Sequence, residues 1–230
     1  MEKLLISATD EWRRAHPGAA IGLLELSGVD NRRAAERLHA RKREIEARLR
    51  ERIGSFTRQD LLALPVMAAY ERYYKRFEKT YHVLLQVESI VLKGKNLPDV
   101  SPLVDANFMA EVETFILTAG HDRMKLRGAV WMDVSRQGDQ MVQMNGTIRA
   151  IRAGDMVMRD VDGICCSILY GQDNRSPISP ETTHVLYVAY APAGAPVEGV
   201  EAHLQHIEEI IRLFSPGAFV ERRDLLKATG

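Results

Sequence analysis

Two polar segments of this 230-residue chain carry side chains that could take part in chemistry. The first is the loop 171–176, which places Gln, Asp, Asn, Arg and Ser between two apolar segments. Such a density of donors and acceptors suits the rim of a ligand pocket, but it also suits a surface turn stiffened by Pro177 and Pro180. The second is His121, which precedes Asp122 in a run of small residues after an expected helix. Loops of this kind often hold ligand contacts.

The remaining candidate ligands form no recognisable site in the sequence. His203 and His206 lie three residues apart on an expected helix, where a metal ion would need further ligands from elsewhere. We expect two exposed histidines there. Cys165 and Cys166 are adjacent, which strains a disulfide between them, and they lack the CxxC spacing of redox and zinc sites. We therefore expect two reduced, buried thiols, with no metal and no organic cofactor.

Several enzyme classes are disfavoured by missing motifs and by the charge balance. The chain contains no GxGxxG, GxxxxGK[ST], GxSxG or HExxH, which argues against a common nucleotide-binding enzyme, a typical serine hydrolase and a zinc protease. Basic and acidic residues are equal in number, 31 of each. No net charge therefore attracts the protein to RNA or to a membrane, and any RNA contact would need a local basic patch.

The expected location follows from hydropathy. No segment approaches the roughly 20 apolar residues of a membrane span, and the opening MEKLLISATDEWRR becomes charged too early for a signal peptide. We expect a cytoplasmic protein that does not enter a membrane. The sequence leaves the oligomeric state open.

The first part of the chain is mainly helical in pattern. Thr9 is expected to cap a helix that ends at Ala15, and 20–26 is expected to form a strand. The clearest helix spans 32–53, with Lys42 and Glu46 paired on its solvated side and an apolar stripe on the other. Shorter helices are expected at 60–64, 66–79, 83–92 and 102–117.

The helix at 66–79 mixes basic and aromatic residues. This combination is typical of single-stranded RNA binding, in which rings stack on bases and cations contact phosphates. An ordinary helix whose aromatic side faces the core explains the spacing better, and we favour it. The residues in question are Arg72, Tyr73, Lys75, Arg76, Lys79 and Tyr81.

From residue 129 onward the pattern changes to short strands. Five apolar or alternating segments follow one another, separated by Gly and Asp turns, and a last amphipathic helix is expected at 198–214. Helices and strands segregated in this way predict an α+β fold with layered sheets packed on helices, helical in its N-terminal half and strand-rich in its C-terminal half. We expect a single domain over 1–230, with a mainly helical part at 1–100 and a pocket-bearing sheet part at 101–214.

Three segments of the sequence resemble a known family. The runs LPDVSPLVDANF, AGHDRMKLRG and SPETTHVLYVAYAP, in this order, are similar to the B3/B4 domain of the phenylalanyl-tRNA synthetase β subunit. The likeness covers about 17–214, and the chain looks most like free-standing proteins built from this domain, in which a stretch like HPGAAIGLLELSGVDN precedes the helices. In the synthetase the domain hydrolyses tyrosine wrongly attached to phenylalanine tRNA. The resemblance therefore implies sheet layers packed on helices and an editing-type pocket.

The resemblance assigns residues to that pocket but leaves two gaps. Asn107 and Asp122 match polar positions of the family. The family's editing histidine falls on Ala119, or on Thr118 if the gap is placed differently. Its glutamate falls on Asn174, and an amide cannot take a proton as a carboxylate can. We hypothesise that His121 and Asp173 replace the two lost groups as catalytic residues. The expected substrate-binding residues are Asn107, Asp122, Gly171, Asn174, Arg175 and Ser176.

Two functions stay open at this point. The first is hydrolysis of a mischarged aminoacyl ester, with tRNA or aminoacyl-tRNA as partner and with backbone N–H groups near Gly171 stabilising the transition state. The second is a non-catalytic module that binds a small amino-acid-like ligand or RNA, which the two lost groups favour. A protein–protein adaptor is a weaker third alternative.

Overall fold

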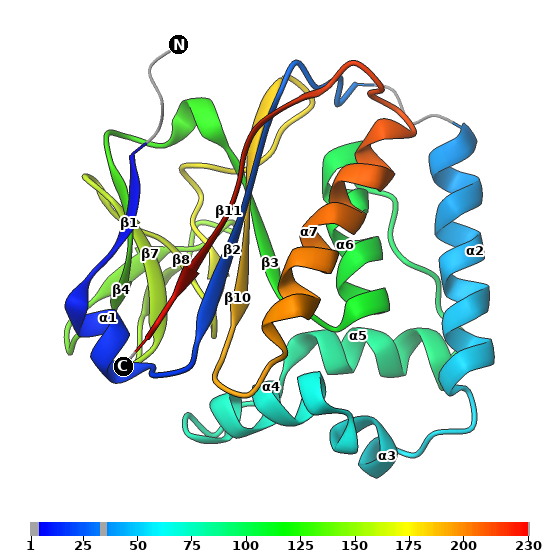
Figure 1. The fold of residues 1–230 in the computed structure, drawn as a ribbon, viewed down its shortest axis with the longest axis horizontal. Helices are drawn as coiled ribbons and strands as arrows, with labels where there is room; N and C mark the ends of the chain where they lie inside the picture. Colours follow the sequence, from blue (N-terminus) through cyan, green and yellow to red (C-terminus); the bar gives the residue numbers. More distant parts are fainter. Residues whose placement is uncertain (1–4, 33–35, 230) are drawn as a thin grey trace.

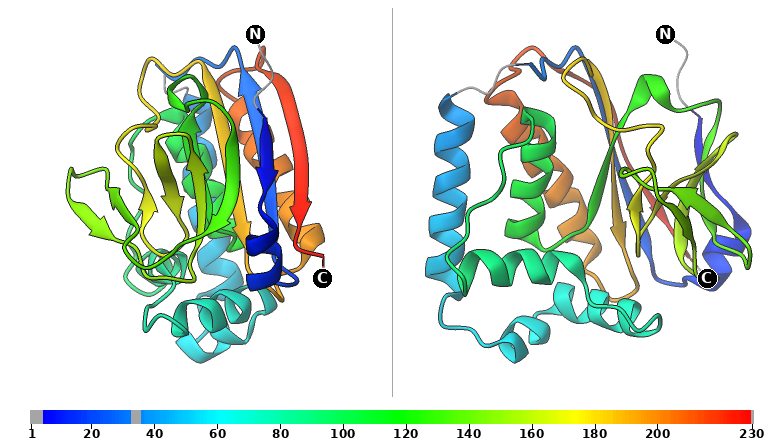
Figure 2. Two further views of the ribbon diagram at one scale, coloured as in Figure 1. Left: turned by 90° about the vertical axis from the view of Figure 1, so that its left-hand side faces the viewer. Right: turned by 180° about the vertical axis from the view of Figure 1, so that it is seen from behind.

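The fold has three layers, seen in Figures 1 and 2. The computed structural model describes residues 5–32 and 36–229. A four-stranded sheet with the order β11-β2-β10-β3 lies in the middle, between a five-stranded sheet with the order β1-β4-β7-β8-β9 and the helices α6 and α7. Strands β5 and β6 form a separate hairpin. Helices α3, α4 and α5 lie across one end of the layers, and α2 packs outside α6 (Figure 1).

The helices and strands have the following bounds. The helices are α1 (Asp10–Ala15), α2 (Glu36–Ile53), α3 (Arg58–Ala63), α4 (Pro65–Lys75), α5 (His82–Val91), α6 (Pro102–Thr114) and α7 (Val197–Arg212), with a 3-10 turn η1 (Arg123–Lys125). The strands are β1 (Ile6–Ala8), β2 (Ala20–Ser27), β3 (Thr118–Asp122), β4 (Val130–Val134), β5 (Gln140–Val142), β6 (Ile148–Ala150), β7 (Met156–Asp160), β8 (Gly163–Ser167), β9 (Gly171–Gln172), β10 (His184–Ala191) and β11 (Phe219–Lys227).

This architecture confirms the predicted α+β fold with sheets layered on helices. It also shows four strands that the sequence analysis did not predict, β1, β3, β9 and β11. The small residues around His121 had predicted a turn. The segment is instead strand β3, in which His121 pairs with Leu186 of β10. The helix at 198–214 is also not the last element, because β11 follows it and pairs with β2 along its full length.

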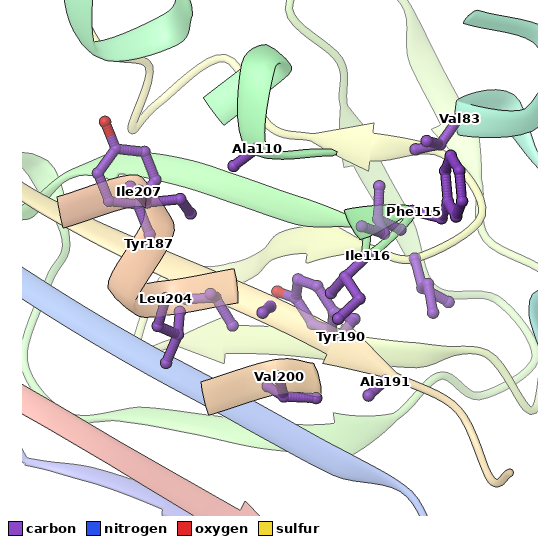
Figure 3. Packing of buried hydrophobic residues seen from close by; sticks show 14 of the residues in the cluster. Val83, Ala110, Phe115, Ile116, Tyr187, Tyr190, Ala191, Val200, Leu204 and Ile207 are labelled. Atoms are coloured by element: carbon purple, nitrogen blue, oxygen red, sulfur yellow. The ribbon is translucent and has the colours of Figure 1, made fainter. Parts of the chain in front are cut away.

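Strands β2 and β10 form the centre of the molecule. They pair antiparallel over eight residues, and all eight residues of β10 are buried. A strand covered on both faces has no polar side, which explains why these segments are mostly apolar. The main exceptions, Glu25 and His184, are buried and contact each other at 2.9 Å. Figure 3 shows Tyr187, Tyr190 and Ala191 of β10 packed near Val200 and Leu204 of α7. Gly22 of β2 is needed at this contact, because a Cβ there would lie 2.6 Å from a methyl of Val200.

The helix ends follow local chemistry. Thr9 caps α1 by accepting from the Trp12 amide, and Thr57 forms a capping box with Asp60 at the start of α3, as predicted. Helix α6 ends earlier than expected because Phe115 takes a left-handed conformation, with φ of 63°. Helix α4 also ends early, and Glu78 just beyond it has φ of 54°.

The prediction that Lys42 and Glu46 pair on the solvated side of α2 is wrong. Leu38, which was expected in the apolar stripe, is buried as predicted, but Lys42 and Glu46 are buried too. Lys42 Nζ lies 2.7 Å from a carboxylate oxygen of Asp105 on α6, and Glu46 accepts from the amide of Leu97. The helix thus has polar contacts on its inner side that periodicity alone does not reveal. The part of the expected helix at 33–35 lies outside the described residues.

The aromatic residues of α4 belong to the core, as we favoured. Tyr73 and Tyr81 are buried, so that neither ring is free to stack on a base. Tyr70 stacks on Tyr81 at 4.1 Å between ring centroids, and its hydroxyl donates to the carbonyl oxygen of Tyr190 on β10. These contacts attach the layer of α4 and α5 to the end of the central sheet.

Candidate functional site

A cavity of about 330 Å³ lies where helices α5 and α6 meet the ends of strands from both sheets. Helix α6 and strand β3 supply opposite walls, and the ends of β8 and β9 close a third side. The turn between β5 and β6 contributes Met144. The volume suits a ligand about the size of an amino acid.

Most of the cavity wall is apolar. Helix α6 presents Val104 and Phe108, which lie four residues apart and therefore share one face of the helix. Leu117 faces the cavity from just before β3, Ile168 from just after β8, and Ile178 from the loop between β9 and β10. Gly120 keeps space in this wall, because a Cβ there would lie 2.7 Å from a methyl of Ile178.

A set of polar atoms in the cavity has no hydrogen-bond partner. Gln86 Oε1 and Asn107 Oδ1 are buried atoms of residues that line the cavity, and neither has a hydrogen-bond partner among the described residues. The Tyr190 hydroxyl has the weakly polar Cys166 thiol as its neighbour. Buried polar groups in native proteins are nearly always satisfied, so two unsatisfied atoms in one cavity indicate a place where a ligand or water completes the bonds.

Glu111 is the ionisable acid of this cavity. It lies on α6 four residues after Asn107, and one of its oxygens accepts from the Thr118 amide at 2.8 Å. The Asn107 side chain also donates to it. Burial raises the pKa of Glu111 to about 8 in spite of these two bonds. The carboxyl group is therefore mostly protonated at pH 7 in the empty cavity, and a bound cation would favour its ionised form.

Two neutral imidazoles lie around the same cavity. His82 lines it, and burial lowers the pKa of this histidine to about 4. His203 of α7 contacts the hydroxyls of Thr114 and Thr118, and burial lowers its pKa to about 3. The expectation that His203 is exposed is therefore wrong, since its side chain joins α7 to the start of β3. His206, one turn later on α7, pairs with Glu113 away from the cavity.

The predicted site residues divide into two groups. Asn107 and Gly171 line the cavity, so that the helix and the loop 171–176, far apart in the chain, do meet around one hollow. Gln172 lines it too. Gly171 has φ of 82°, a conformation that favours glycine and that turns the chain into β9.

His121, Ser176 and Asp173 form a buried cluster beside the cavity but do not line it. His121 Nδ1 lies 2.8 Å from Ser176 Oγ, and that hydroxyl donates to Asp173. Burial lowers the pKa of His121 to about 3 and raises the pKa of Asp173. Gln172 connects the cluster to the cavity wall, because its amide contacts His121 Nδ1 and donates to the Ser176 carbonyl.

The remaining predicted residues make structural contacts. Asp122 caps η1 and accepts from the Thr182 hydroxyl. Arg175 forms ion pairs with Asp160 and Asp173, at 3.0 and 2.8 Å. Asn174 is exposed, and its backbone amide donates to the hairpin at Val142. None of the three lines the cavity.

The sequence analysis missed Gln86, Glu111 and Tyr190. Glu111 carried a usable signal, because a glutamate four residues after an asparagine among Met109, Ala110 and Val112 places two polar groups on one face of an apolar helix. Gln86 and Tyr190 gave no such signal, since their role depends on how α5 approaches the end of β10.

Within 5–32 and 36–229, no three His, Cys, Asp or Glu side chains gather in a way that could hold a metal ion. In the same part of the chain no helix is long and apolar enough to cross a membrane. Cys165 and Cys166 are free and buried, as predicted.

Comparisons with known proteins identify a family and similar solved structures. The model of the B3/4 domain matches residues 67–222, about two thirds of the chain. The crystal structure of an N-terminal fragment of the phenylalanyl-tRNA synthetase beta-subunit from Pyrococcus horikoshii matches with a TM-score of 0.49 and 7% sequence identity. The match covers 96% of this chain and 51% of that chain, so that this chain spans about half of that fragment. No curated protein matches the chain.

Proposed function

The chain belongs to the B3/4 domain family, and from this premise we propose that its cavity binds an amino-acid-sized ligand through the ligand's amino group. One observation carries the proposal: Gln86 Oε1, Asn107 Oδ1 and the Glu111 carboxyl are all hydrogen-bond acceptors in one cavity, and within 5–32 and 36–229 the first two have no partner. An ammonium group has three donors and no acceptor, and it therefore complements this set.

The rest of the cavity determines which amino acids fit. Val104, Phe108, Leu117 and Ile168 offer an apolar surface, which favours an apolar or aromatic side chain over a charged one. The Tyr190 hydroxyl can donate to, or accept from, a polar atom at the far end of such a side chain. The proposed ligand thus has an amino group and a largely apolar body.

A screen of unfolding temperature tests this function. A ligand that binds only the native state raises the midpoint of unfolding, by an amount that grows with its concentration above Kd. We expect aromatic or large aliphatic amino acids to raise the midpoint and their N-acetyl derivatives, which lack the ammonium charge, to have no effect. Equal shifts with acetylated and free amino acids would contradict recognition of the amino group.

A matched pair of variants locates the binding. Glu111→Gln removes the acid from the cavity and should abolish the shift. Glu113→Gln makes the same change on the same helix, where the carboxylate pairs with Arg48 and His206 outside the cavity. Loss of the ligand shift in both variants, or in neither, would speak against the cavity as the binding place.

A second function, hydrolysis of an aminoacyl ester on tRNA, is favoured by the state of Glu111. A carboxyl group with a pKa near 8 can exchange a proton close to neutral pH, as a general acid or base must. His121 and Asp173 stay predicted catalytic residues, and they reach the cavity only through Gln172. A deacylation assay on misacylated tRNA should compare the wild type with Glu111→Gln, His121→Ala and Asp173→Ala. If none of the four proteins deacylates the tRNA faster than the uncatalysed background, hydrolysis is contradicted and ligand binding stays as the proposed function.

A further inference from the structure

A second cleft, of about 230 Å³, lies at the opposite end of α4 from α3. Four segments line it: the turn 15–19 before β2, the last two turns of α4, Met156 of β7, and Pro192 and Ala193 after β10. The two loops lie close together, since a Cβ added at Gly18 would be 3.6 Å from the Cβ of Ala193. We call this feature the arginine cleft, after Arg72 and Arg76, which line it.

Both arginines reach the cleft without an acidic partner. Arg72 and Arg76 lie four residues apart on α4, so that their side chains share one face. Among the described residues neither guanidinium has an ion pair or a hydrogen bond, whereas the neighbouring Lys75 pairs with Glu71. Two adjacent cations without an anion repel each other, and an anion between them would remove that cost.

The two guanidinium groups lie against neighbouring residues, and both arginines are exposed. Arg76 lies over the rings of Tyr73 and Phe77, at 5.3 and 5.4 Å from the ring centroids. A Cβ added at Gly194 would lie 2.4 Å from a guanidinium nitrogen of Arg72. Gly194 also has φ of 90°, which favours glycine. Both guanidinium groups are therefore accessible to a ligand that enters from solvent.

A buried imidazole completes the cleft. His16 lines it, is only 4% exposed, and its Nε2 has no hydrogen-bond partner among the described residues. Its ring lies 5.9 Å from the ring of Tyr73, centroid to centroid. A buried nitrogen without a partner beside two unpaired guanidinium groups indicates a missing acceptor.

We propose that the arginine cleft binds a phosphate group, with Arg72 and Arg76 donating to its oxygens and His16 Nε2 donating a further bond. The planar guanidinium fork matches phosphate oxygens in geometry as well as in charge. Burial and the charge of Arg76 lower the pKa of His16 to about 4, so that the ring is neutral at pH 7 and donates as the Nε2–H tautomer.

The acids nearest to these groups are already engaged. Glu71 pairs with Lys75, Glu78 faces Arg152, and Asp155 accepts from the Tyr73 hydroxyl and from Ser167. None of the three lines the arginine cleft. The cleft therefore offers donors and positive charge to an incoming oxyanion, with no carboxylate aimed at it.

Nuclear magnetic resonance on the full chain tests the proposal. The imidazole signals of His16 should shift saturably with sodium phosphate, compared with sodium chloride of equal ionic strength, with a Kd on the order of millimolar for a lone anion. The variant Arg72→Gln/Arg76→Gln should weaken binding at least about tenfold, as expected for the loss of two charge-assisted contacts. Its circular dichroism shows whether it is folded.

A matched control and a milder variant keep the test decisive. Lys75→Gln/Lys93→Gln removes the same charge from exposed positions outside the cleft and should leave the Kd unchanged. Arg72→Lys/Arg76→Lys keeps the charge and should give an intermediate Kd, because the bidentate geometry is lost. The proposal would be overturned if Lys75→Gln/Lys93→Gln weakened phosphate binding as much as Arg72→Gln/Arg76→Gln does. It would also be overturned if the His16 signals showed no saturable shift at 50 mM phosphate.

The source of the phosphate can be read from competition. Glycerol 3-phosphate represents a small phosphorylated molecule, and a short RNA with a 5′-phosphate represents a nucleic acid end. Displacement of inorganic phosphate by either supports the site and identifies the source. The same RNA without its 5′-phosphate serves as the control. If it displaces inorganic phosphate as strongly as the phosphorylated RNA does, the backbone charges of the RNA explain binding, and a site for one phosphate group is overturned.

Discussion

Two buried polar regions lie along α6, and they differ in how far their hydrogen bonds are satisfied. Near the start of α6, the ammonium group of Lys42 from α2 donates to the Pro98 carbonyl, to Asp99 and to Asp105. All three N–H donors of Lys42 are therefore used. Asp105 also accepts from the Val100 amide. Two residues further along α6, Asn107 lines the cavity, and its Oδ1 has no hydrogen-bond partner in the described part of the chain.

The difference separates structure from function. A buried charge network in which every group is paired attaches α2 and the loop 97–101 to α6, and adding a ligand there would gain nothing. A set of unsatisfied groups around a cavity costs folding free energy, and such a cost is found where a protein keeps groups ready for binding. Both regions look alike in the sequence, as polar residues in an apolar helix.

The largest expected effect comes from breaking the satisfied region. Lys42→Met leaves the buried carboxylate of Asp105 without its cation, which should lower the free energy of unfolding by about 3–5 kcal/mol. Urea unfolding at pH 7 measures this. If the free energy of unfolding fell by less than about 1 kcal/mol, the contacts of Lys42 with Asp105 would not be a main source of stability, and the comparison would fail.

The second prediction concerns the unsatisfied region, where Glu111 should make the stability of the protein depend on pH. The pKa of Glu111 is raised in the folded state, from 4.5 to about 8, so that the folded protein holds its proton more tightly than the unfolded chain. Stability from this group is thus complete below pH 4.5 and is lost as pH rises toward 8. Glu111→Gln should be more stable than wild type by a few kcal/mol at pH 8 and about equal at pH 4.5.

The pH comparison needs a difference between two proteins, because other buried groups titrate as well. Burial raises the pKa of Asp155 to about 7 and lowers the pKa of His16 and His82 to about 4. These groups are common to wild type and Glu111→Gln and cancel in the difference. A difference that stays constant from pH 4.5 to 8 would contradict a raised pKa of Glu111.

The third effect is the smallest. Gln86→Leu replaces a side chain whose Oε1 has no partner by an apolar group of similar size, and it should change the free energy of unfolding by less than about 1 kcal/mol. The same variant should lose the ligand-induced rise in unfolding temperature. A loss of stability as large as that of Lys42→Met would place Gln86 in the structural network instead.

The sequence revealed the layers of this fold better than its site. Apolar periodicity was enough for α2, for the aromatic side of α4 and for the continuous strand β10, because these patterns arise from burial alone. It failed at His121, where small residues of a strand look like a turn, and at the edge strand β11, whose alternation is weak. Pairing with a distant strand decides both cases, and a single sequence does not contain it.

The site was only partly accessible for a similar reason. Asn107 and the loop 171–176 were placed around one hollow by the resemblance to the B3/B4 domain, and both do border the cavity through Asn107, Gly171 and Gln172. Glu111, by contrast, matters because of its desolvation, which depends on what packs around it in three dimensions. Residue type and spacing gave Asp105 and Glu111 the same appearance, an acid in an apolar helix, and could not tell which of the two would be satisfied.

Proton release on ligand binding tests the central claim most directly. If an ammonium group binds beside Glu111, the carboxyl must ionise, and at pH 7 up to about one proton should leave for each ligand bound. Calorimetry with the best amino acid from the screen, in two buffers of different ionisation enthalpy, measures this number for wild type and for Glu111→Gln. We predict close to one proton for wild type and no detectable binding for the variant. Binding without proton release, or equal affinity in both proteins, would contradict the claim that the unsatisfied groups of the cavity form an amine site.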